Sequence, residues 1–534
     1  MSKLIKILLS LIVVIILCVV VGGALLMTFV NPNRFKPLII EQVQKNIGRQ
    51  LTMDGNLSWS FYPSFGIKVG HVILNNPSGF QSTLFAELES ATLSVKLLPL
   101  FHSKIESSGM TIKGLTLNLI TNANGTNNWG DLKTGSAKTS PSNAAAGMMI
   151  AIKAIDVIDA KINWINQKTQ TKLVIDKFNL TAKDVALDQS FPINFKFHAL
   201  DKEREFNISG HSNILINSQN QTVSGKLTLN PFDISNPEIK NLSGDFDFAT
   251  TASKKVSLKG DMHADLMQVN KVKITAIAAP VRYANDMLSL YHVTGNFYQG
   301  KINGDAVVNL SAAVPSITLY ANLADVQIGP LVEDLGAQNK SYKIKGTGNI
   351  QLHTTTSGTD GKVLLQNLNG NGQFNISNGV LEGLDVGYLI QKAYNTVKGQ
   401  PLSGQDTNQT QFSSLTGSVT ITKGVVTNND LLLSASKATS KGNGQIDLVN
   451  QQINYTLQTA VKADAQSTKN DIKNLYGITI PIRITGSLTH PNIGLDLNNL
   501  AQQAASKEFQ NVKEKAIERV KQKAGGLLKN LLGN

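Results

Sequence analysis

The sequence predicts a mainly β protein: an elongated, strongly twisted antiparallel sheet, with a hydrophobic helix at the N-terminus and an amphipathic helix at the C-terminus. Three observations predict this fold class. A glycine followed by alternating polar and apolar residues recurs along the chain, which is the pattern of a half-buried strand. Helical periodicity is scarce. Only 16% of the 534 residues are charged, against about 25% in soluble domains, so uncharged polar residues must carry much of the surface.

The N-terminal element is a hydrophobic segment that contains no charged residue from Ile7 to Val30. A helix of about 20 apolar residues, rising about 1.5 Å per residue, crosses the ~30 Å hydrocarbon core of a bilayer. We therefore predict one transmembrane anchor within residues 1–30, with the rest of the chain beyond the membrane. A cleaved signal peptide is the alternative, but the apolar run continues past the small residues that end at Ala24.

The body of the chain is predicted to be an antiparallel meander. Short helices are expected over 33–47, directly after the anchor, and over 384–397. Period-2 alternation places the apolar residues of each strand on one sheet face, and we expect the leading glycine to supply the turn into the strand. Asn-Gly pairs at 303–304 and 378–379 predict tight turns. The repeated phrase occupies Gly225–Leu229, Gly244–Phe248, Gly372–Ile376, Gly417–Ile421 and Gly444–Leu448.

The chain is divided by a segment that lacks alternation. Residues 134–148 are mostly small or polar and include one charge, which is typical of a flexible linker or loop. The predicted parts are a transmembrane anchor (1–30), an N-terminal module (31–133), this linker (134–148), a central β-repeat region (149–359), a C-terminal module (360–498) and a basic amphipathic helix (499–534).

The C-terminal helix has two interpretations. Its apolar residues recur at helical spacing, and from Lys507 to Lys529 seven basic residues outweigh three acidic ones, a net charge of +4. Such a helix can rest on an anionic membrane surface, or it can cap the open end of the sheet. The residues predicted to face a membrane are Phe509, Val512, Val520 and Leu527.

Several classes of function are disfavoured by the sequence. The single cysteine, Cys18, allows neither a disulfide framework nor a thiolate zinc site, and the eight histidines form no H-x-x-x-H pair. The doubled glycines that begin at 346, 370 and 442 lead into strands instead of helices, so we do not interpret them as phosphate-binding loops. We expect no enzyme activity, no cofactor and no metal. Nucleic-acid binding is disfavoured despite a pI near 9.4, because no basic stripe with interleaved aromatic residues is present.

One apolar face per strand has to be covered, because large exposed apolar patches are rare on monomers. With few helices available, the sheet either closes into a sandwich or leaves an open trough lined by apolar side chains. In the C-terminal module, the same-face residues of successive strands that would line a trough are Phe374, Ile376, Val419, Ile421, Ile446, Leu448, Tyr455 and Leu457.

Motifs at both ends of the chain resemble those of a known family. The N-terminal ones are Gly48-Arg49-Gln50-Leu51, Asp54-Gly55-Asn56-Leu57-Ser58-Trp59 and Gly125-Thr-Asn-Asn-Trp129. The C-terminal ones include Phe412-Ser-Ser-Leu-Thr-Gly417 and Ile480-Pro481-Ile-Arg-Ile-Thr-Gly486. In this order, directly after an anchor segment, they resemble the AsmA family of Gram-negative envelope proteins. Residues from about 150 to 359 diverge from the family pattern.

The resemblance implies a single-pass inner-membrane protein with most of its chain in the periplasm, and a role in outer-membrane biogenesis. Larger members look like β-sheet troughs that carry phospholipid, which favours the trough over the sandwich. It implies no catalytic residue. The expected partners are the inner membrane, contact with the outer membrane, phospholipid and envelope assembly proteins. The alternative function is a structural scaffold or assembly factor for outer-membrane proteins, with a closed β-core and no lipid conduit.

Overall fold

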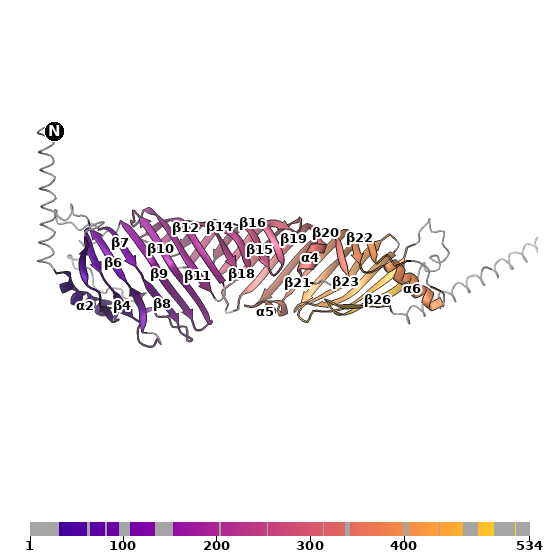
Figure 1. The fold of residues 1–534 in the computed structure, drawn as a ribbon, viewed down its shortest axis with the longest axis horizontal. Coiled ribbons are helices and arrows are strands. Elements are labelled where there is room, and N and C mark those ends of the chain that lie inside the picture. The colour runs from indigo at the N-terminus through magenta and orange to yellow at the C-terminus, as the bar shows by residue number, and fades with distance from the viewer. Residues whose placement is uncertain are drawn as a thin grey trace, which may run out of the picture. The chain divides into compact units, whose positions relative to one another are not determined.

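The computed structural model describes residues 31–60, 65–80, 83–95, 107–133, 153–201, 204–251, 253, 255–312, 314–336, 342–398, 401, 405–436, 438–462, 479–495 and 518. The chain divides into two compact units, residues 1–260 and 261–534. Both are mainly β with few helices, as predicted (Figure 1). The predicted anchor at 1–30 and linker at 134–148 lie outside the described residues, and so does the C-terminal helix apart from Glu518.

The helix expected over 33–47 is confirmed. It starts as the 3-10 turn η1 (Pro32–Phe35) and continues as α2 (Lys36–Ile47). The side-chain oxygen of Asn31 accepts a hydrogen bond from the backbone N–H of Asn33, which caps the first turn. Gly48 ends α2 in the left-handed conformation, with φ of 74°, which a glycine adopts without steric cost. Among the helices in the described ranges, none is both long enough and apolar enough to cross a membrane.

The first unit begins with two rows of short strands. One row pairs β2, β3, β6 and β7 in that order, and the other pairs β1, β4, β5 and β8. A second 3-10 turn, η2 (Asp131–Lys133), follows β8. The strands are β1 (Leu51–Met53), β2 (Leu57–Ser60), β3 (Gly66–Val69), β4 (Val72–Asn75), β5 (Leu84–Leu88), β6 (Ser90–Val95), β7 (Ser107–Lys113) and β8 (Thr116–Thr121).

Both rows join the same strand, β9 (Ala154–Asn166), in parallel. The first half of β9, up to Ile158, pairs with β7, and the second half, from Lys161, pairs with β8. Asp159 lies at the switch, with φ of 53°. A bulge of this kind bends a strand and lets it change partners. These parallel pairings depart from the all-antiparallel meander that the sequence predicts.

From β9 onward the first unit is an antiparallel meander of long strands. Each strand pairs with the next through β14, and the boundary between the two units falls within β15 (Val256–Val269). The strands after β9 are β10 (Thr171–Lys183), β11 (Ser190–Asp201), β12 (Arg204–Asn217), β13 (Thr222–Ser235) and β14 (Glu238–Thr250).

The second unit continues this pattern: each strand from β16 to β27 pairs antiparallel with the next. Its strands are β16 (Val272–Ala284), β17 (Met287–Phe297), β18 (Gly300–Asn309), β19 (Ser316–Gln327), β20 (Lys343–Ser357), β21 (Asn369–Glu382), β22 (Gln409–Thr422), β23 (Val425–Ala435), β24 (Ala438–Asp447), β25 (Gln452–Val461), β26 (Thr479–Ser487) and β27 (Pro491–Leu495). Its described helices are α4 (Ile328–Asp334), α5 (Gly361–Gln366) and α6 (Val386–Lys398). The sequence predicted α6 but not α4 or α5.

The Asn-Gly turn predictions are wrong. Residues 303–304 lie inside β18 and residues 378–379 inside β21. The turn into β18 is formed instead by Tyr298 and Gln299, which both have positive φ, 45° and 64°. Two successive residues of this conformation match the twist of a tight hairpin, and Asn-Gly is only the commonest way to supply them.

Candidate functional site

The residues predicted to line a trough lie on strands β21–β25 of the second unit. Leu448 is an exception, because β24 ends at Asp447 and Leu448 begins the turn that follows. The others are Phe374 and Ile376 in β21, Val419 and Ile421 in β22, Ile446 in β24, and Tyr455 and Leu457 in β25.

The strand register places these seven residues on one face of the sheet. Residues directly opposite each other in an antiparallel pair point to the same side. Ile421 lies opposite Gly370 in β21 and Val426 in β23. Val426 lies opposite Ile446, which lies opposite Ile453 in β25. Alternation along each strand then adds the remaining predicted residues to the same face.

Helix α4 covers part of this face. Its residues Ile328 and Leu331 are 4% and 8% exposed, and they belong to one apolar cluster with Ile376. The tip of Ile328 lies against Gly348, the residue opposite Ile376, so closely that a Cβ there would come within 2.4 Å of it. The helix therefore packs directly on the sheet, and Ile376 is part of a closed core.

Helix α6 covers a second part of the face. Its residues Val386 and Ile390 cluster with Tyr455 and Leu457, which are each 8% exposed, and with Ile482, which is fully buried. In the second unit, the predicted lining residues that contact α4 or α6 are thus core residues. The sequence offered no sign of this for α4, a seven-residue helix without a side-chain N-cap.

Two tyrosine hydroxyls help to hold the covered regions in place. Tyr298 donates a hydrogen bond to Asp334, the last residue of α4, with 2.7 Å between the oxygens. Burial, and then the Asp334 carboxylate, raise the pKa of Tyr298 to about 12. Tyr455 donates to the side-chain oxygen of Asn428, and burial, with a contribution from Asp430, raises the pKa of Tyr455 to about 12. Both hydroxyls therefore stay protonated in the neutral pH range.

The first unit presents a comparable apolar face on β9–β14, but without a helical cover. It has three described helical elements, η1, α2 and η2. Of these, η1 packs on β2 and α2 packs on β1, and none of the three packs extensively on β9–β14. Two rungs of directly opposite residues cross these strands, and most of their apolar side chains are half-buried. We call this surface the open apolar face and define it by Ile155, Val157, Leu180, Ile193, Phe195, Leu227 and Leu229.

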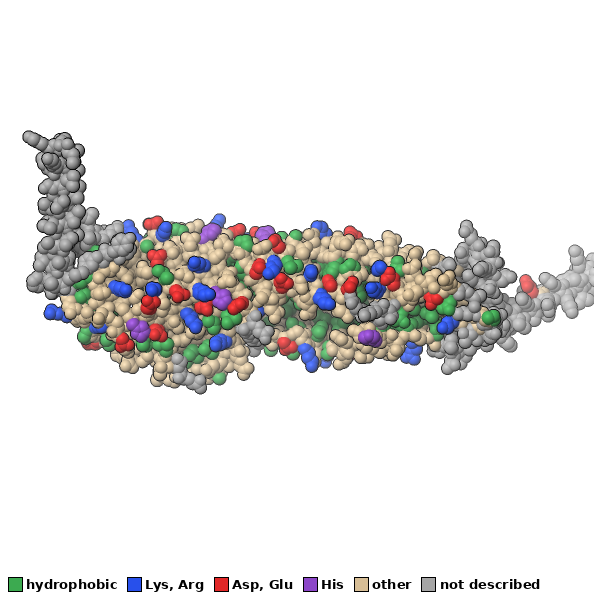
Figure 2. All heavy atoms as spheres, in the orientation of Figure 1, with side chains coloured by type: hydrophobic (Ala, Val, Ile, Leu, Met, Phe, Trp, Pro, Cys, Tyr) green, Lys and Arg blue, Asp and Glu red, His purple; other side chains and the backbone are tan. Residues whose placement is uncertain are grey.

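The opposite side of the same strands is polar. Asn194, Lys196 and Lys226 alternate with residues of the open apolar face and are exposed, as are Asp245 and Asp247 of β14. The carboxylate of Asp245 accepts a hydrogen bond from the Thr228 hydroxyl at 2.6 Å. Figure 2 shows one side of the molecule, on which acidic and basic side chains are interspersed without a patch of one sign. The sheet in this unit thus has one apolar and one water-facing side.

The sequence reasoning placed its candidates in 360–498 and missed the open apolar face in 149–250. A signal was present. Phe191, Ile193, Phe195 and Phe197 alternate with a proline and two polar residues, which puts three aromatic rings and an isoleucine on one side of β11. The motifs on which the family resemblance rests all lie outside this segment.

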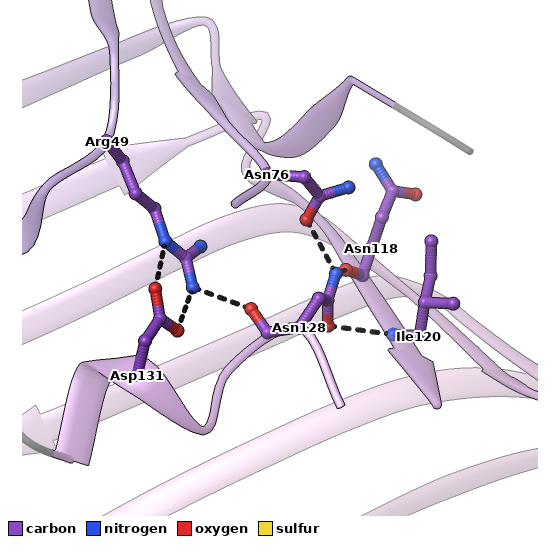
Figure 3. Close-up of polar contacts among 6 residues, drawn as sticks. All are labelled: Arg49, Asn76, Asn118, Ile120, Asn128 and Asp131. Carbon is purple, nitrogen blue, oxygen red and sulfur yellow. Dashed lines mark hydrogen bonds and ion pairs between the residues drawn. The ribbon is translucent and has the colours of Figure 1, made fainter. Parts of the chain in front are cut away.

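The motif arginine Arg49, which directly follows the end of α2, has a structural role (Figure 3). Its side chain is 1% exposed. Nε donates to Asp131 Oδ2 at 3.0 Å, and Nη2 donates to Asp131 Oδ1 at 2.5 Å and to the carbonyl of Asn128 at 2.6 Å. The guanidinium also lies 4.4 Å from the centre of the Phe85 ring. The hydrogen bond from Arg49 lowers the pKa of Asp131, although partial burial acts in the opposite direction.

Asn128 extends this network to β8. Its side-chain oxygen accepts from the backbone N–H of Ile120 at 2.9 Å. Its side-chain nitrogen donates to the carbonyl of Asn118 and to the side-chain oxygen of Asn76, both at 2.7 Å (Figure 3). The two motifs that contain Arg49 and Asn128 are therefore explained by one buried network, which fastens the end of α2 to η2 and β8. Within the described residues no cluster of three or more His, Cys, Asp or Glu side chains could hold a metal ion.

Comparisons with known proteins agree on one family. The model of the AsmA family matches residues 1–258 and 233–431. Protein AsmA of Escherichia coli (strain K12) is 20% identical over 599 aligned residues, which cover 94% of this chain and 94% of that relative. No solved structure matches the chain.

Proposed function

Because the chain belongs to the AsmA family, we propose that it supports outer-membrane assembly by carrying phospholipid acyl chains along an apolar β-sheet face, without catalysing a reaction. AsmA family membership itself suggests an envelope role in outer-membrane assembly in Gram-negative bacteria. Lipid carriage is a more specific role than this. The observation that supports it best is the open apolar face of β9–β14.

The physical argument concerns the cost of moving an acyl chain through water. Each CH₂ group exposed to water costs about 0.8 kcal/mol, so a chain of about 15 such groups needs about 12 kcal/mol to leave a membrane unprotected. A continuous apolar surface removes most of this cost. Six strands spaced by 4.7–4.8 Å make a face about 24 Å wide, which exceeds the about 15 Å depth of one leaflet.

The proposed arrangement also includes a membrane tether. Residues 1–30 would anchor the chain in the inner membrane, with the two β units in the periplasm. The network around Arg49 supports this arrangement, because it joins α2, the first described helix after the anchor segment, firmly to the first unit. A rigid connection would hold the first unit, with its open apolar face, near the membrane surface from which lipid is taken.

A second candidate function is a scaffold or assembly factor for outer-membrane proteins. The observation in its favour is the cover that α4 and α6 provide over the apolar face of the second unit, where Ile376 and Leu457 are core residues. The residues beneath these two helices pack as a core, which is what a scaffold without a lipid conduit requires. The two functions differ in whether the open apolar face of the first unit contacts lipid.

A transfer assay between two vesicle populations distinguishes them. Donor vesicles contain phosphatidylglycerol and a self-quenched fluorescent phospholipid, and acceptor vesicles contain no label. The full chain is expected to speed up dequenching. Ile193→Asp places a charge on the open apolar face and is expected to abolish this effect.

The matched control is Asn194→Asp, which adds the same charge one residue away on the opposite, exposed side of β11. It is expected to transfer lipid like the unmodified chain. Equal transfer by both variants, with both folded, would contradict lipid carriage on this face and favour the scaffold.

A further inference from the structure

A cavity of about 590 Å³ opens in the second unit across strands β18–β22. It lies on the side of the sheet opposite the apolar face, because Gln351 and Gln373, which line it, alternate with Ile350 and Phe374 of the apolar side. Its volume is within the range of about 300–1,000 Å³ that small-molecule sites occupy. Lipid carriage makes no use of this side of the sheet.

One row of side chains in the cavity consists of amides. Asn322, Gln351 and Gln373 lie directly opposite one another in β19, β20 and β21. The side-chain nitrogen of Gln373 donates a hydrogen bond to the side-chain oxygen of Gln351, which joins the two amides. Each amide offers both hydrogen-bond donors and an acceptor. Asn322 is the least expected of the three, because Asn is depleted in ordinary strands.

The next row supplies a flat apolar surface. Tyr320 in β19 lies opposite His353 in β20, and their rings stack with centres 4.0 Å apart and planes 7° from parallel. Tyr320 is 50% exposed. The stack orients the tyrosine ring against its neighbour, and Tyr320 is among the residues that line the cavity.

The charged residues that line the cavity disfavour an anionic ligand. Among the described residues that line it there is no lysine or arginine, and Asp305 is the one acidic residue. One oxygen of Asp305 accepts a hydrogen bond from the backbone N–H of His292 at 2.8 Å. A phosphate or sulfate group would meet a carboxylate here and no cation. The chemistry fits an uncharged ligand rich in hydroxyl or acetamido groups.

We propose that this cavity binds a carbohydrate, with a pyranose ring stacked on Tyr320 and sugar hydroxyl or acetamido groups bonded to the amide row. Aromatic rings accept the apolar C–H face of a sugar, and side-chain amides pair with its polar edge. Five strands give the cavity a width of about 19 Å across the sheet, which suits an extended chain of several sugar rings.

Isothermal titration of the full chain in phospholipid nanodiscs tests this proposal. Nanodiscs are needed because common detergents carry sugar head groups that would compete. The probes are chitotetraose, cellotetraose and inorganic phosphate. We expect at least one tetrasaccharide to bind and phosphate not to bind. Binding of chitotetraose alone identifies an N-acetylated glycan as the source, and binding of both identifies recognition through the hydroxyl groups.

Tyr320→Ala is expected to weaken tetrasaccharide binding about tenfold through loss of the stacking surface, whereas Tyr320→Phe retains it. Tyr291→Ala is the matched control, because Tyr291 is 41% exposed in the same unit and does not line the cavity. Absence of binding by both tetrasaccharides at millimolar concentration, or equal weakening by Tyr291→Ala, would overturn the proposal. Vesicle transfer of phospholipid is expected to be unchanged in Tyr320→Ala, so the outcome is independent of the proposed function.

Discussion

The ring of Phe412 in β22 lies directly over Gly379 in β21, so that a Cβ on Gly379 would come within 2.0 Å of the ring carbon Cζ. The same relationship joins Phe374 to Gly417, where the distance would be 2.9 Å. It recurs in the first unit, where a Cβ on Gly210 would lie 2.9 Å from the ring of Phe195. Glycine thus makes room for an aromatic ring on the neighbouring strand, which shields the glycine backbone in return.

Gly379→Ala is expected to destabilise the second unit by about 1–3 kcal/mol, because Phe412 must leave its position and the carbonyl of Lys345 would lie 2.5 Å from the new methyl group. Chemical denaturation measures the change. Gly361→Ala is the matched control, since a Cβ there meets nothing within 4 Å. Equal stability of the two variants would contradict the packing role of Gly379.

Asp131→Asn is expected to destabilise the first unit by about 1–2 kcal/mol at neutral pH. The substitution removes the charge that pairs with the buried Arg49, and the partial exposure of Asp131 keeps the value modest. Glu89→Gln is the control: it removes an exposed pair with Lys113 and is expected to change stability by less than about 0.5 kcal/mol.

The same pair gives a pH dependence. Arg49 holds the pKa of Asp131 below its ordinary value of 3.8. The contribution of Asp131 is therefore fully present above that ordinary value and is lost as the pH falls through the lower pKa of the folded state. The stability difference between the unmodified chain and Asp131→Asn is expected to shrink in acid. Thermal melts over an acidic pH series check this, and a constant difference would count against the pair.

Tyr298→Phe is expected to cost about 1 kcal/mol through loss of the hydrogen bond to Asp334 on α4. The pKa of Tyr298 is raised to about 12, so its stabilising effect is present below the ordinary pKa of 10.0 and is lost as the pH rises towards 12. In an ultraviolet titration of tyrosinate, Tyr298→Phe is expected to remove one group that ionises late. Loss of an early group instead would contradict the burial of Tyr298 together with its hydrogen bond to Asp334.

A carboxylate introduced by mutation is expected to affect the covered apolar face and the open apolar face differently. Leu457→Asp, in the cluster under α6, is expected to cost several kcal/mol, about 3–5, and to unfold the second unit, because the new carboxylate is buried without a partner. Leu180→Asp, on the half-buried open apolar face, is expected to leave the first unit folded. Circular dichroism melts compare the two. Unfolding of both variants would indicate that the first unit is also a closed core.

Much of the strand pattern could be predicted from alternation alone. The phrase at Gly372–Ile376 lies in β21 and the phrase at Gly417–Ile421 lies in β22, and the register places their apolar residues on one side. The prediction that these glycines form turns is wrong, since Gly379 and Gly417 lie within strands under aromatic rings. A glycine has the same appearance in a sequence whether it turns the chain or makes room for a ring.

The covers of the apolar face could be predicted only in part. Helix α6 has thirteen residues and clear helical spacing, whereas α4 has seven, includes Pro330 and has no capping side chain. The switch of partners within β9 at Asp159 could not be predicted from the sequence, because pairing with β7 and β8 depends on contacts distant in sequence. For the buried network around Arg49, the sequence shows only the motif and not the contacts that Arg49 makes.

The most direct test of the central claim is photo-crosslinking in living cells at four positions of the first unit. Ile193 and Leu227 belong to the open apolar face, on one rung, and Asn194 and Lys226 are their neighbours on the exposed side. Phospholipid carriage predicts that crosslinkers at Ile193 and Leu227 capture phospholipid and that those at Asn194 and Lys226 do not. Absence of lipid at all four positions, or equal capture on both sides of the sheet, would contradict it.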